Sequence, residues 1–479
     1  MFKNLKFSKN YIILFFILSS ICFLLDNFTD KGDIWFLLCH GRYILSNGFP
    51  YTDVLSMHTG LNFVMQQWLS SVIFYVIYNY LGKIAFYIFM FLMNLLITFL
   101  IYKLCLVISN RKFSSCFITL ITMFLLQINF IAPRPQIFTF IILIVVLIIL
   151  ELFSSKRKKY INFLPILSVL LINFHASMWP MLFIFCMPYV VELILNKDKD
   201  VFKLIGIMFI SVLGGFINPY GIDAMTYSFI GYGDNLIVKI VGEMANFNLL
   251  GPIYTKIWSI IILFIFLVSN LIMLLYTNKK NKRVAHLLLF YGTFFMCLLG
   301  IRNFALFVLA TIPFLVKFIE IKDIDKFIVN KNWIINYTVV IIIFVLSFIS
   351  VFKDKKYEFV HNINDAVVYL NENVSKDIKI YCDYSDGSFL EYYGYKPYID
   401  ARAELFLKKM NKKENILKEY IDFNLDEKTR DKFIKKYNFD YYIISSSNYE
   451  LVDYLINYKD SNLELVYAYE KVYLVKRVS

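Results

Sequence analysis

Apolar runs recur along the first 351 residues of the chain and alternate with short polar segments. Each run has about 15–23 residues, enough for an α-helix to cross the hydrocarbon core of a bilayer. The apolar segment 69–81, which ends at Gly82, fits a helix lying along the membrane surface. We therefore expect a polytopic α-helical membrane protein. The pattern predicts eleven spans, at residues 11–25, 84–106, 115–131, 137–153, 161–174, 179–195, 204–217, 257–275, 285–301, 303–317 and 333–351.

The polar segments differ in charge on the two sides of these spans. Alternate loops hold most of the Lys and Arg residues, beginning with basic residues close to Met1. Because basic loops stay in the cytoplasm, the N-terminus is predicted to be cytoplasmic. The odd number of spans then places residues 352–479 outside, together with the long loops 26–83 and 218–256. Any chemistry is expected on that outer side, since the cytoplasmic loops are short and basic.

Residues 352–479 have a lower hydropathy than the rest of the chain and predict a soluble α/β domain. The predicted domains are thus a transmembrane domain, 1–351, and an extracytoplasmic domain, 352–479. No GxGxxG motif, P-loop or zinc-ligand spacing occurs in the second domain. Helices are expected at 362–373, 411–421, 427–437 and 448–457. Strands are expected at 379–382, 440–445, 463–469 and 472–476, the last two as a hairpin.

Composition supports a membrane protein and removes one alternative. Hydrophobic residues make up 59% of the chain and charged residues 18%, whereas soluble proteins average about 45–50% and 25%. The net charge of +13 would suit a nucleic-acid partner, but residues 352–479 carry 21 Lys/Arg and 22 Asp/Glu. The positive excess therefore lies in the membrane part, where it sets topology, and no nucleic-acid partner is expected.

The cysteines suggest no redox or metal chemistry. All seven are scattered, most of them in apolar runs, without metal-ligand spacing. A disulfide between Cys39 and Cys382 would need both thiols on an oxidising side, and nothing in their spacing supports it. We expect the cysteines in apolar runs to behave as small hydrophobic residues.

The loop that follows the first span has the most varied chemistry in the chain. Residues 26–69 hold four aspartates, two histidines, one arginine and two tryptophans. Long connections with mixed chemistry usually carry function. Asp33 and Asp53 are the candidate catalytic carboxylates of this loop. The simpler alternative is that they cap helices or stabilise turns, and Asp33 is well placed to cap the helix predicted for 34–45.

Transfer of a sugar from a lipid-phosphate donor would use such groups. The attacking hydroxyl must lose a proton, which requires a base such as a carboxylate. The leaving phosphate requires Arg or Lys to hold its developing charge. Arg134, between two prolines, and Arg302 lie at predicted outer ends of spans and are the candidate phosphate ligands. Arg134 fits an interfacial anchor equally well.

Other polar residues allow several interpretations. His40 and His58 could join the acids around a divalent cation, but such residues more often hydrogen-bond within a loop. His175 could line a cavity or satisfy a helix end. Glu192 is the main ionisable residue in the spans and lies near a cytoplasmic end. No ion pathway of the kind found in a transporter is therefore evident.

A series of short motifs covers nearly the whole chain and carries a resemblance. They are Asp33-Ile-Trp35, Gly41-Arg42, Gly48-Phe-Pro50-Tyr-Thr-Asp53, Trp68-Leu69, Arg134-Pro-Gln136, Asn173-Phe-His175, Asn218-Pro-Tyr-Gly221, Glu243, Arg302-Asn303, Asp383-Tyr-Ser-Asp386-Gly387 and Asp400-Ala-Arg402-Ala-Glu404. In order and spacing they resemble bacterial integral-membrane proteins of the GT-C glycosyltransferase class. These are relatives of the protein O-mannosyltransferases and the lipid A aminoarabinose transferases.

The resemblance implies a multi-pass enzyme of the bacterial plasma membrane. Such an enzyme would move a sugar from a polyprenyl-phosphate-linked donor to a glycan, lipid or protein acceptor of the cell envelope, with inversion. An acid of the first outer loop would be the base, which matches Asp33 best, with Asp30 three positions away. A D/E-x-D/E pair common in some GT-C loops is missing here, which weakens any metal assignment. The remaining candidate site residues are His40, His58, Trp68, His175, Glu243, Asp400, Arg402 and Glu404.

Two other functions stay open, and so does the role of one group of residues. A GT-C-fold protein without catalysis could bind lipid-linked glycans or scaffold envelope assembly. A lipid or glycan transporter would need a polar path to the cytoplasmic side. In the C-terminal domain, Asp400, Arg402 and Glu404 would help to cover the cavity or select the acceptor, or form a salt-bridge cluster within the domain.

Overall fold

The chain forms two compact units. One is built from Leu81–Ser228 and Gly242–Tyr357 with the N-terminal segment Met1–Phe28, and the other from Thr29–Tyr80, Phe229–Val241 and Glu358–Ser479. The computed structural model describes residues 16–24, 33–109, 112–128, 130–231, 234–275, 283–316, 333–355, 361–445, 448–457, 463–469 and 471–478.

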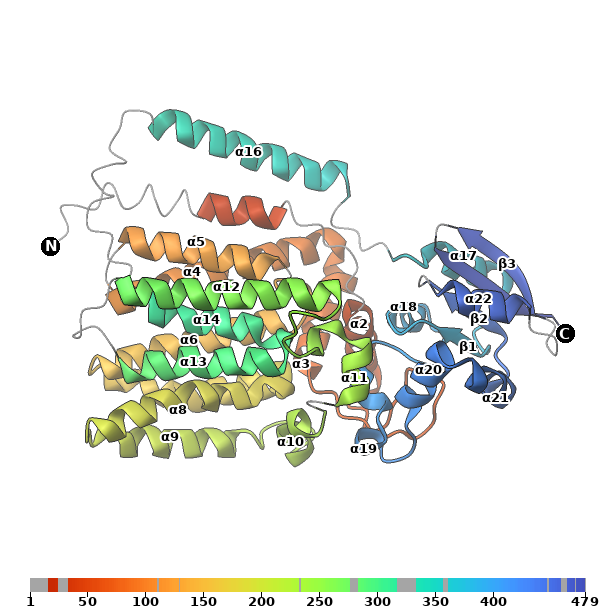
Figure 1. Cartoon of the computed structure of the whole chain (residues 1–479), viewed down its shortest axis with the longest axis horizontal. Helices are drawn as coiled ribbons and strands as arrows, with labels where there is room; N and C mark the ends of the chain where they lie inside the picture. Colours follow the sequence, from red (N-terminus) through yellow and green to blue (C-terminus); the bar gives the residue numbers. More distant parts are fainter. Residues whose placement is uncertain are drawn as a thin grey trace. The chain divides into compact units, whose positions relative to one another are not determined.

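The first unit is a helical bundle (Figure 1). Within it α13 packs against α14, α4 against α6, and α7 against α9. Residues 16–24 are helical as well. The helices of this unit are α4 (Gly82–Ser109), α5 (Lys112–Gln127), α6 (Gln136–Ser154), η2 (Lys158–Phe163), α7 (Leu164–His175), η3 (Ala176–Met178), α8 (Trp179–Leu195), α9 (Asp200–Gly214), η4 (Gly242–Met244), α12 (Ile253–Leu275), α13 (Val284–Leu299), η6 (Ile301–Asn303), α14 (Phe304–Val316) and α16 (Trp333–Lys353), with α10 (Ile222–Gly231) at the junction with the second unit.

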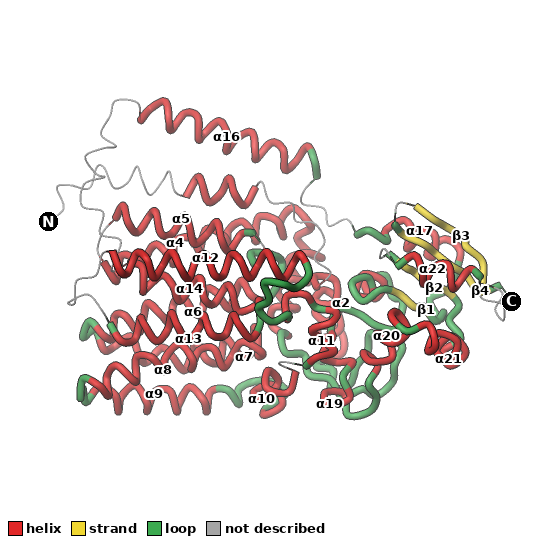
Figure 2. The backbone as a smooth tube through the Cα atoms, in the orientation of Figure 1, coloured by secondary structure: helices red, strands yellow, loops and turns green. Residues whose placement is uncertain are grey.

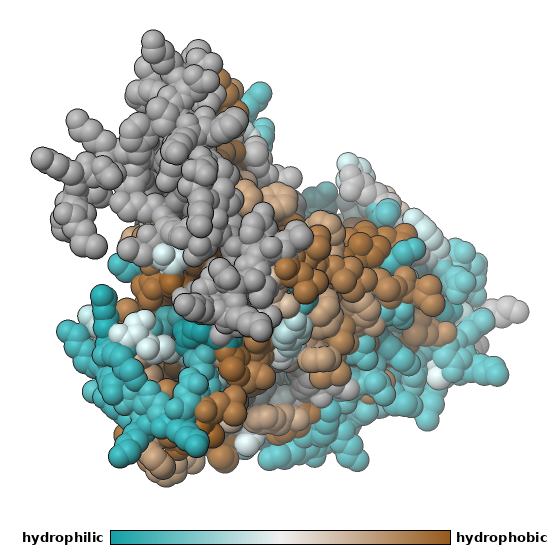
Figure 3. Space-filling view, turned by 60° about the vertical axis from the view of Figure 1, so that its left-hand side comes forward, coloured by the Kyte–Doolittle hydropathy of each residue, from teal (hydrophilic) through white to brown (hydrophobic). Residues whose placement is uncertain are grey.

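Several of these helices have the length and apolar composition of membrane spans. Trp68–Ser109, Gln136–Ser154, Lys158–Leu195 and Ile253–Leu274 are long enough to cross a bilayer, and four shorter helices are also apolar. Figure 3 shows a broad apolar surface bordered by hydrophilic side chains. The helices α6 and α14 begin and end within one residue of the predicted spans 137–153 and 303–317. The helical membrane architecture is thus confirmed, while the count of eleven spans stays a prediction.

The apolar segment 69–81 is helical, as α3 (Trp68–Val76) and the π-helical turn η1 (Ile77–Leu81), and α4 follows from Gly82. Its position along the membrane surface stays a prediction. Gly82 adopts a φ of +89° at the start of α4. A side chain with a Cβ rarely adopts that conformation, so glycine permits the change of backbone direction.

An ion cluster links three helices of the first unit. Glu151 on α6 accepts hydrogen bonds from Arg283 (2.9 Å), His286 (2.8 Å) and Tyr189 (2.7 Å). Arg283 also donates to Glu192 on α8 at 3.2 Å. Since an ionisable side chain among apolar helices requires partners, this cluster explains how Glu151 is tolerated. Sequence analysis singled out only Glu192 and missed Glu151.

The second unit contains a four-stranded sheet in the order β1-β2-β4-β3 (Figure 2). The strands are β1 (Ile380–Cys382), β2 (Tyr441–Ile444), β3 (Leu463–Tyr469) and β4 (Val472–Arg477). β1 and β2 are parallel, and β4 runs antiparallel to both β2 and β3. The predicted strands and the closing hairpin are therefore confirmed. The helices of this unit are α2 (Asp33–Asn47), α3, α11 (Asn235–Ile240), α17 (Asn364–Asn373), α18 (Gly387–Tyr392), η7 (Ala403–Phe406), α19 (Lys408–Asn411), α20 (Ile416–Leu425), α21 (Glu427–Tyr437) and α22 (Tyr449–Ile456).

The long loop predicted at 26–83 belongs largely to this second unit. α2 packs against α3 and α18. The ring of Trp35 on α2 lies 4.9 Å from the rings of Phe389 and Tyr392 on α18. The sequence pattern predicts a boundary at residue 351 and groups this loop with the spans. The contacts instead group Thr29–Tyr80 and Phe229–Val241 with Glu358–Ser479, because aromatic side chains of α2 complete the core of the C-terminal segment.

Candidate active site

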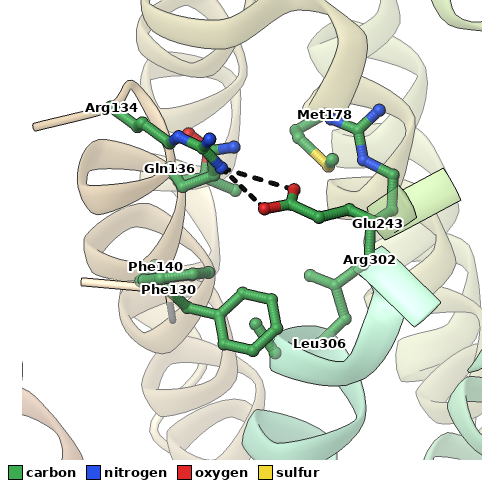
Figure 4. A pocket seen from close by; sticks show the side chains of 10 residues that line it. Phe130, Arg134, Gln136, Phe140, Met178, Glu243, Arg302 and Leu306 are labelled. Atoms are coloured by element: carbon green, nitrogen blue, oxygen red, sulfur yellow. Dashed lines mark hydrogen bonds and ion pairs between the residues drawn. The ribbon is translucent and has the colours of Figure 1, made fainter. Parts of the chain in front are cut away.

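Three of the predicted site residues meet in one pocket of the first unit (Figure 4). Arg134 lies in the turn before α6, Glu243 in η4 and Arg302 in η6. The pocket is narrow, with free space of about 20 Å³, room for about one water molecule. Its other walls come from Phe130, Gln136, Thr139, Phe140, Met178, Ala305 and Leu306.

Arg134 and Glu243 form an ion pair across this pocket. The Nη1 atom of Arg134 lies 3.0 Å and 3.3 Å from the two carboxylate oxygens of Glu243. Their side chains are 16% and 26% exposed. A partly buried carboxylate holds the arginine in one direction, so Arg134 is a positioned cation with its charge already balanced.

Arg302 has different surroundings in the same pocket. Its Nη1 lies 3.2 Å from the Met244 sulfur, a weak acceptor. Among the described residues, no carboxylate lies within ion-pair distance of Arg302, which is half-buried. A thioether neither neutralises a guanidinium nor uses all of its N–H donors. Arg302 therefore keeps its positive charge and has donors that can bind an anion.

The neutral polar groups of the pocket come from α6. Thr139 Oγ1 lies 2.9 Å from Nδ1 of His175, which is buried at the end of α7. His175 is thus connected to the pocket through Thr139 and does not line it. Gln136 Oε1 is buried and has no hydrogen-bond partner among the described residues, which leaves an acceptor facing a polar ligand or water.

A second cluster of predicted residues is centred on Arg402 in the other unit. Arg402 donates to Asp400 through Nε at 2.8 Å and Nη2 at 2.5 Å, to Asp53 at 2.6 Å and to Glu391 at 3.2 Å. Its Nη1 also lies 3.4 Å from Nε2 of His40. The Arg402 side chain is 6% exposed and the three carboxylates are fully buried. Buried charges of this kind are stable only when paired in this way.

The protonation states of the cluster follow from these contacts. Burial alone would raise the pKa of Asp53, but the charge of Arg402 and hydrogen bonds from Ser56 and Arg402 lower it to about 2. Burial and the Arg402 charge lower the pKa of His40 to about 3. The Nδ1 atom of His40 lies 2.8 Å from the Phe36 carbonyl. Because a carbonyl only accepts, Nδ1 carries the proton and Nε2 accepts from Arg402.

This cluster favours a structural role for Asp53, Asp400 and Arg402. A general base must reach the proton that it removes, whereas the Asp53 carboxylate is fully buried and already bound to Arg402 and Ser56. His40 uses both ring nitrogens within the protein. The salt-bridge alternative that the sequence allowed thus agrees with the geometry better than a catalytic assignment does.

Asp33 and Glu404 have more open surroundings in the same unit. Asp33 is half-buried and is the first residue of α2, and Glu404 is half-buried in η7. Burial, then the charge of Glu404 and then that of Asp33, raise the pKa of Tyr384 well above its usual value. Tyr384 donates to the Ala401 carbonyl at 2.6 Å. The two carboxylates therefore lie near one phenol, a neighbourhood that the separated sequence positions did not reveal.

The remaining candidates are accounted for locally. His58 Nε2 lies 2.8 Å from the Tyr398 carbonyl, and the Trp68 ring packs edge-on against Phe49. Asp30 lies outside the described residues. Cys39 and Cys382 are both free thiols. Across the part of the chain that the structure describes, no three His, Cys, Asp or Glu side chains are grouped as metal ligands.

Two functional-site neighbours were missed by sequence analysis. Glu391 contacts Arg402, and Tyr384 lies near Asp33 and Glu404. Glu391 is buried in the short helix α18, and a buried glutamate nearly always has a cationic partner. The sequence showed only its apolar neighbours in 387–392, and no signal identified Tyr384.

Comparisons with known proteins were made for the whole chain. No protein-family model matches it, and no curated protein sequence matches it. Among solved structures, the fold is similar to the archaeal oligosaccharyltransferase AglB from Archaeoglobus fulgidus, determined in complex with an inhibitory peptide and a dolichol-phosphate. The TM-score is 0.60 at 11% sequence identity, over 95% of this chain and 71% of that chain. The predicted GT-C membrane fold is thus confirmed at the level of the overall fold.

Proposed function

We propose that this protein is a membrane glycosyltransferase that takes a sugar from a polyprenyl-phosphate-linked donor. The acceptor would be an extracytoplasmic glycan, lipid or protein, and the membrane a bacterial plasma membrane with the N-terminus in the cytoplasm. The proposal is supported by the similarity in fold to a membrane oligosaccharyltransferase. It rests above all on Arg302, whose described surroundings include a thioether and no paired carboxylate.

The proposed reaction is a single displacement at the anomeric carbon. An acceptor hydroxyl attacks that carbon, its oxygen–carbon bond forms, and the bond from carbon to the phosphate oxygen breaks. The proton of the hydroxyl passes to a carboxylate, and the lipid phosphate leaves with the bonding electrons. The protein must therefore supply one accessible base and one group that stabilises the phosphate charge.

Arg302 is the proposed phosphate ligand. Its guanidinium can offer two parallel N–H donors to a phosphate. Because the pocket has so little free space, the incoming phosphate must displace the side chain of Met244 or Met178, and methionine is flexible enough to yield. Arg134 is the proposed second cation, held in direction by Glu243.

Asp33 is the proposed base, because it is the more accessible of the two leading acids. Asp53 is buried against Arg402 and is assigned a positioning role in the unit that carries Asp33. Glu404, near the same tyrosine as Asp33, is a second acid that could orient the acceptor. The C-terminal α/β domain would then select the acceptor.

The test is sugar transfer by membranes that contain the full chain, supplied with a panel of polyprenyl-phosphate sugars. Asp33→Asn keeps the size of the side chain and removes the base, so turnover should fall by about 10²-fold or more. Arg302→Gln should weaken donor binding and turnover together, while Arg302→Lys should recover part of the activity.

Matched controls separate catalysis from general damage. Asp377→Asn and Lys256→Gln change exposed residues of the second and first unit, respectively, and should leave transfer unchanged. Full activity of Asp33→Asn would overturn its assignment as the base. Donor binding without transfer from any sugar by the wild type would favour a non-catalytic protein that binds lipid-linked glycans.

A further inference from the structure

An open pocket in the second unit lies apart from the Arg402 cluster. Its free volume is about 620 Å³, within the range of about 300–1,000 Å³ usual for small-molecule sites. It is lined by the start of α17, the end of β2 and the β3–β4 hairpin. The lining residues are His361, Asn362, Asn364, Asp365, Ser445, Tyr467, Tyr469, Lys471 and Val472.

This pocket lies beyond the carboxyl end of β2, a position in α/β sheets where ligands often bind. β1 and β2 are parallel, and Ser445 directly follows the carboxyl end of β2. Val472 begins β4, which runs antiparallel to β2 and therefore has its first residues at the same edge. In open α/β sheets, ligands occupy the space beyond the carboxyl ends of parallel strands.

The floor of the pocket is rigidly held. Ser445 is fixed by its backbone N–H, which donates to Asp383 at 2.8 Å, and by its hydroxyl, which donates to Asp386. His361 stacks on the Phe389 ring with centroids 4.5 Å apart and an interplanar angle of 13°. A site built on fixed side chains loses little entropy when a ligand binds.

The chemistry of the lining excludes strongly charged ligands. Asp365 and Lys471 balance one another in charge, and one lysine is too little for a phosphate-rich ligand. The other polar groups are two amides, one serine hydroxyl, one imidazole and two phenols, each able to donate or accept a hydrogen bond. Tyr469 on β3 is 59% exposed, so its ring is available for contact with an apolar face.

These features together match a sugar ring. Adjacent hydroxyls of a pyranose need neighbouring donors and acceptors, such as those of Asn362, Asn364 and Asp365. The C–H face of the same ring carries a partial positive charge that suits the negative face of an aromatic ring. We propose that the pocket between α17, the end of β2 and the β3–β4 hairpin is a binding subsite for a neutral saccharide.

The experiment measures binding by saturation-transfer-difference NMR on the full chain in nanodiscs. The probes are neutral tetrasaccharides of glucose, mannose, galactose and N-acetylglucosamine. We expect at least one of them to receive saturation on its ring protons. Tyr469→Ala should weaken that binding by about five- to tenfold, and Asp365→Asn should weaken it as well. No donor and no turnover are involved, so this result is independent of the proposed transferase activity.

Tyr449→Ala is the matched control, because Tyr449 on α22 is 51% exposed and does not line the pocket. It should leave binding unchanged. If none of the four tetrasaccharides receives saturation from the protein, the proposal is overturned. So would equal binding by wild type and Tyr469→Ala, which would place the sugar elsewhere. A neutral tetrapeptide is tested as a further probe. If it receives saturation and no tetrasaccharide does, the pocket binds peptides and the proposal is overturned.

Discussion

The guanidinium of Arg402 donates a hydrogen bond of 2.6 Å to the carboxylate of Asp53, although 349 positions separate them in the sequence. This contact joins the loop after the first apolar run to the C-terminal segment within one compact unit. The two segments therefore fold as a single structure, which has consequences for stability.

Replacement of Arg402 by Gln should severely destabilise the second unit. It would leave the buried carboxylates of Asp53 and Asp400 without their cation, a loss of about 3–5 kcal/mol in the free energy of unfolding. Thermal unfolding can be followed with a thiol-reactive fluorescent dye, because Cys39 and Cys382 are buried and free. Arg42→Gln is the control, since Arg42 is exposed and bonds weakly to the Tyr392 carbonyl. Equal melting temperatures of the two variants would contradict the prediction.

The contribution of Asp386 to the stability of this unit should fall as pH rises from about 4 to about 7. Burial, followed by the charge of Asp383, raises the pKa of Asp386 to about 7, although Ser445 and Ser385 oppose that shift. The unfolded carboxyl has a pKa near 3.9, so the folded state binds more protons between the two values. Stability is therefore greatest below about pH 4 for this group and is lost toward pH 7, by up to about 4 kcal/mol.

Asp386→Asn should remove this contribution, because an amide has no proton to lose, so the stability of the wild type relative to the variant should fall as pH rises. Melting temperatures measured across pH 4–8 test this, with the exposed Asp377→Asn as control. An Asp386→Asn curve parallel to that of the wild type would contradict the assignment.

Gly387→Ala should destabilise the packing of α18. A Cβ at this position would lie 1.9 Å from the Ile399 carbonyl oxygen and 2.9 Å from the Asp400 Cα. Both neighbours are backbone atoms, so the main chain must move, at a cost of about 1–3 kcal/mol. Gly292→Ala in α13 has no atom within 4 Å of the added Cβ and should be neutral or stabilising. The dye assay distinguishes the two, and an unchanged melting temperature for Gly387→Ala would refute the close approach.

The ion cluster of the first unit should contribute strongly to helix packing. Glu151→Leu would leave Arg283 and His286 without one of their acceptors, and we expect a loss of about 3–5 kcal/mol. Lys158→Gln removes an ion pair with Asp200 in which the Lys158 side chain is 41% exposed, and should cost about 1 kcal/mol. Similar losses of unfolding free energy in the two variants would contradict a strong contribution of the Glu151 cluster.

Sequence alone determined the class of this protein. Apolar runs of bilayer length, basic alternate loops and a polar C-terminal segment predicted helices such as α6 and α14 within one residue. The sequence also predicted the hairpin of β3 and β4. These features are local, because a helix satisfies its own backbone and a hairpin pairs neighbouring segments.

Tertiary structure decided which polar residues belong together. Arg134, Glu243 and Arg302 were separate candidates in sequence, and only the fold placed them around one pocket. Asp53 looked like a catalytic acid in its loop, but the fold buries it beside Arg402. Charge and accessibility depend on neighbours brought from distant segments, so the local pattern that predicts a helix carries no information about them.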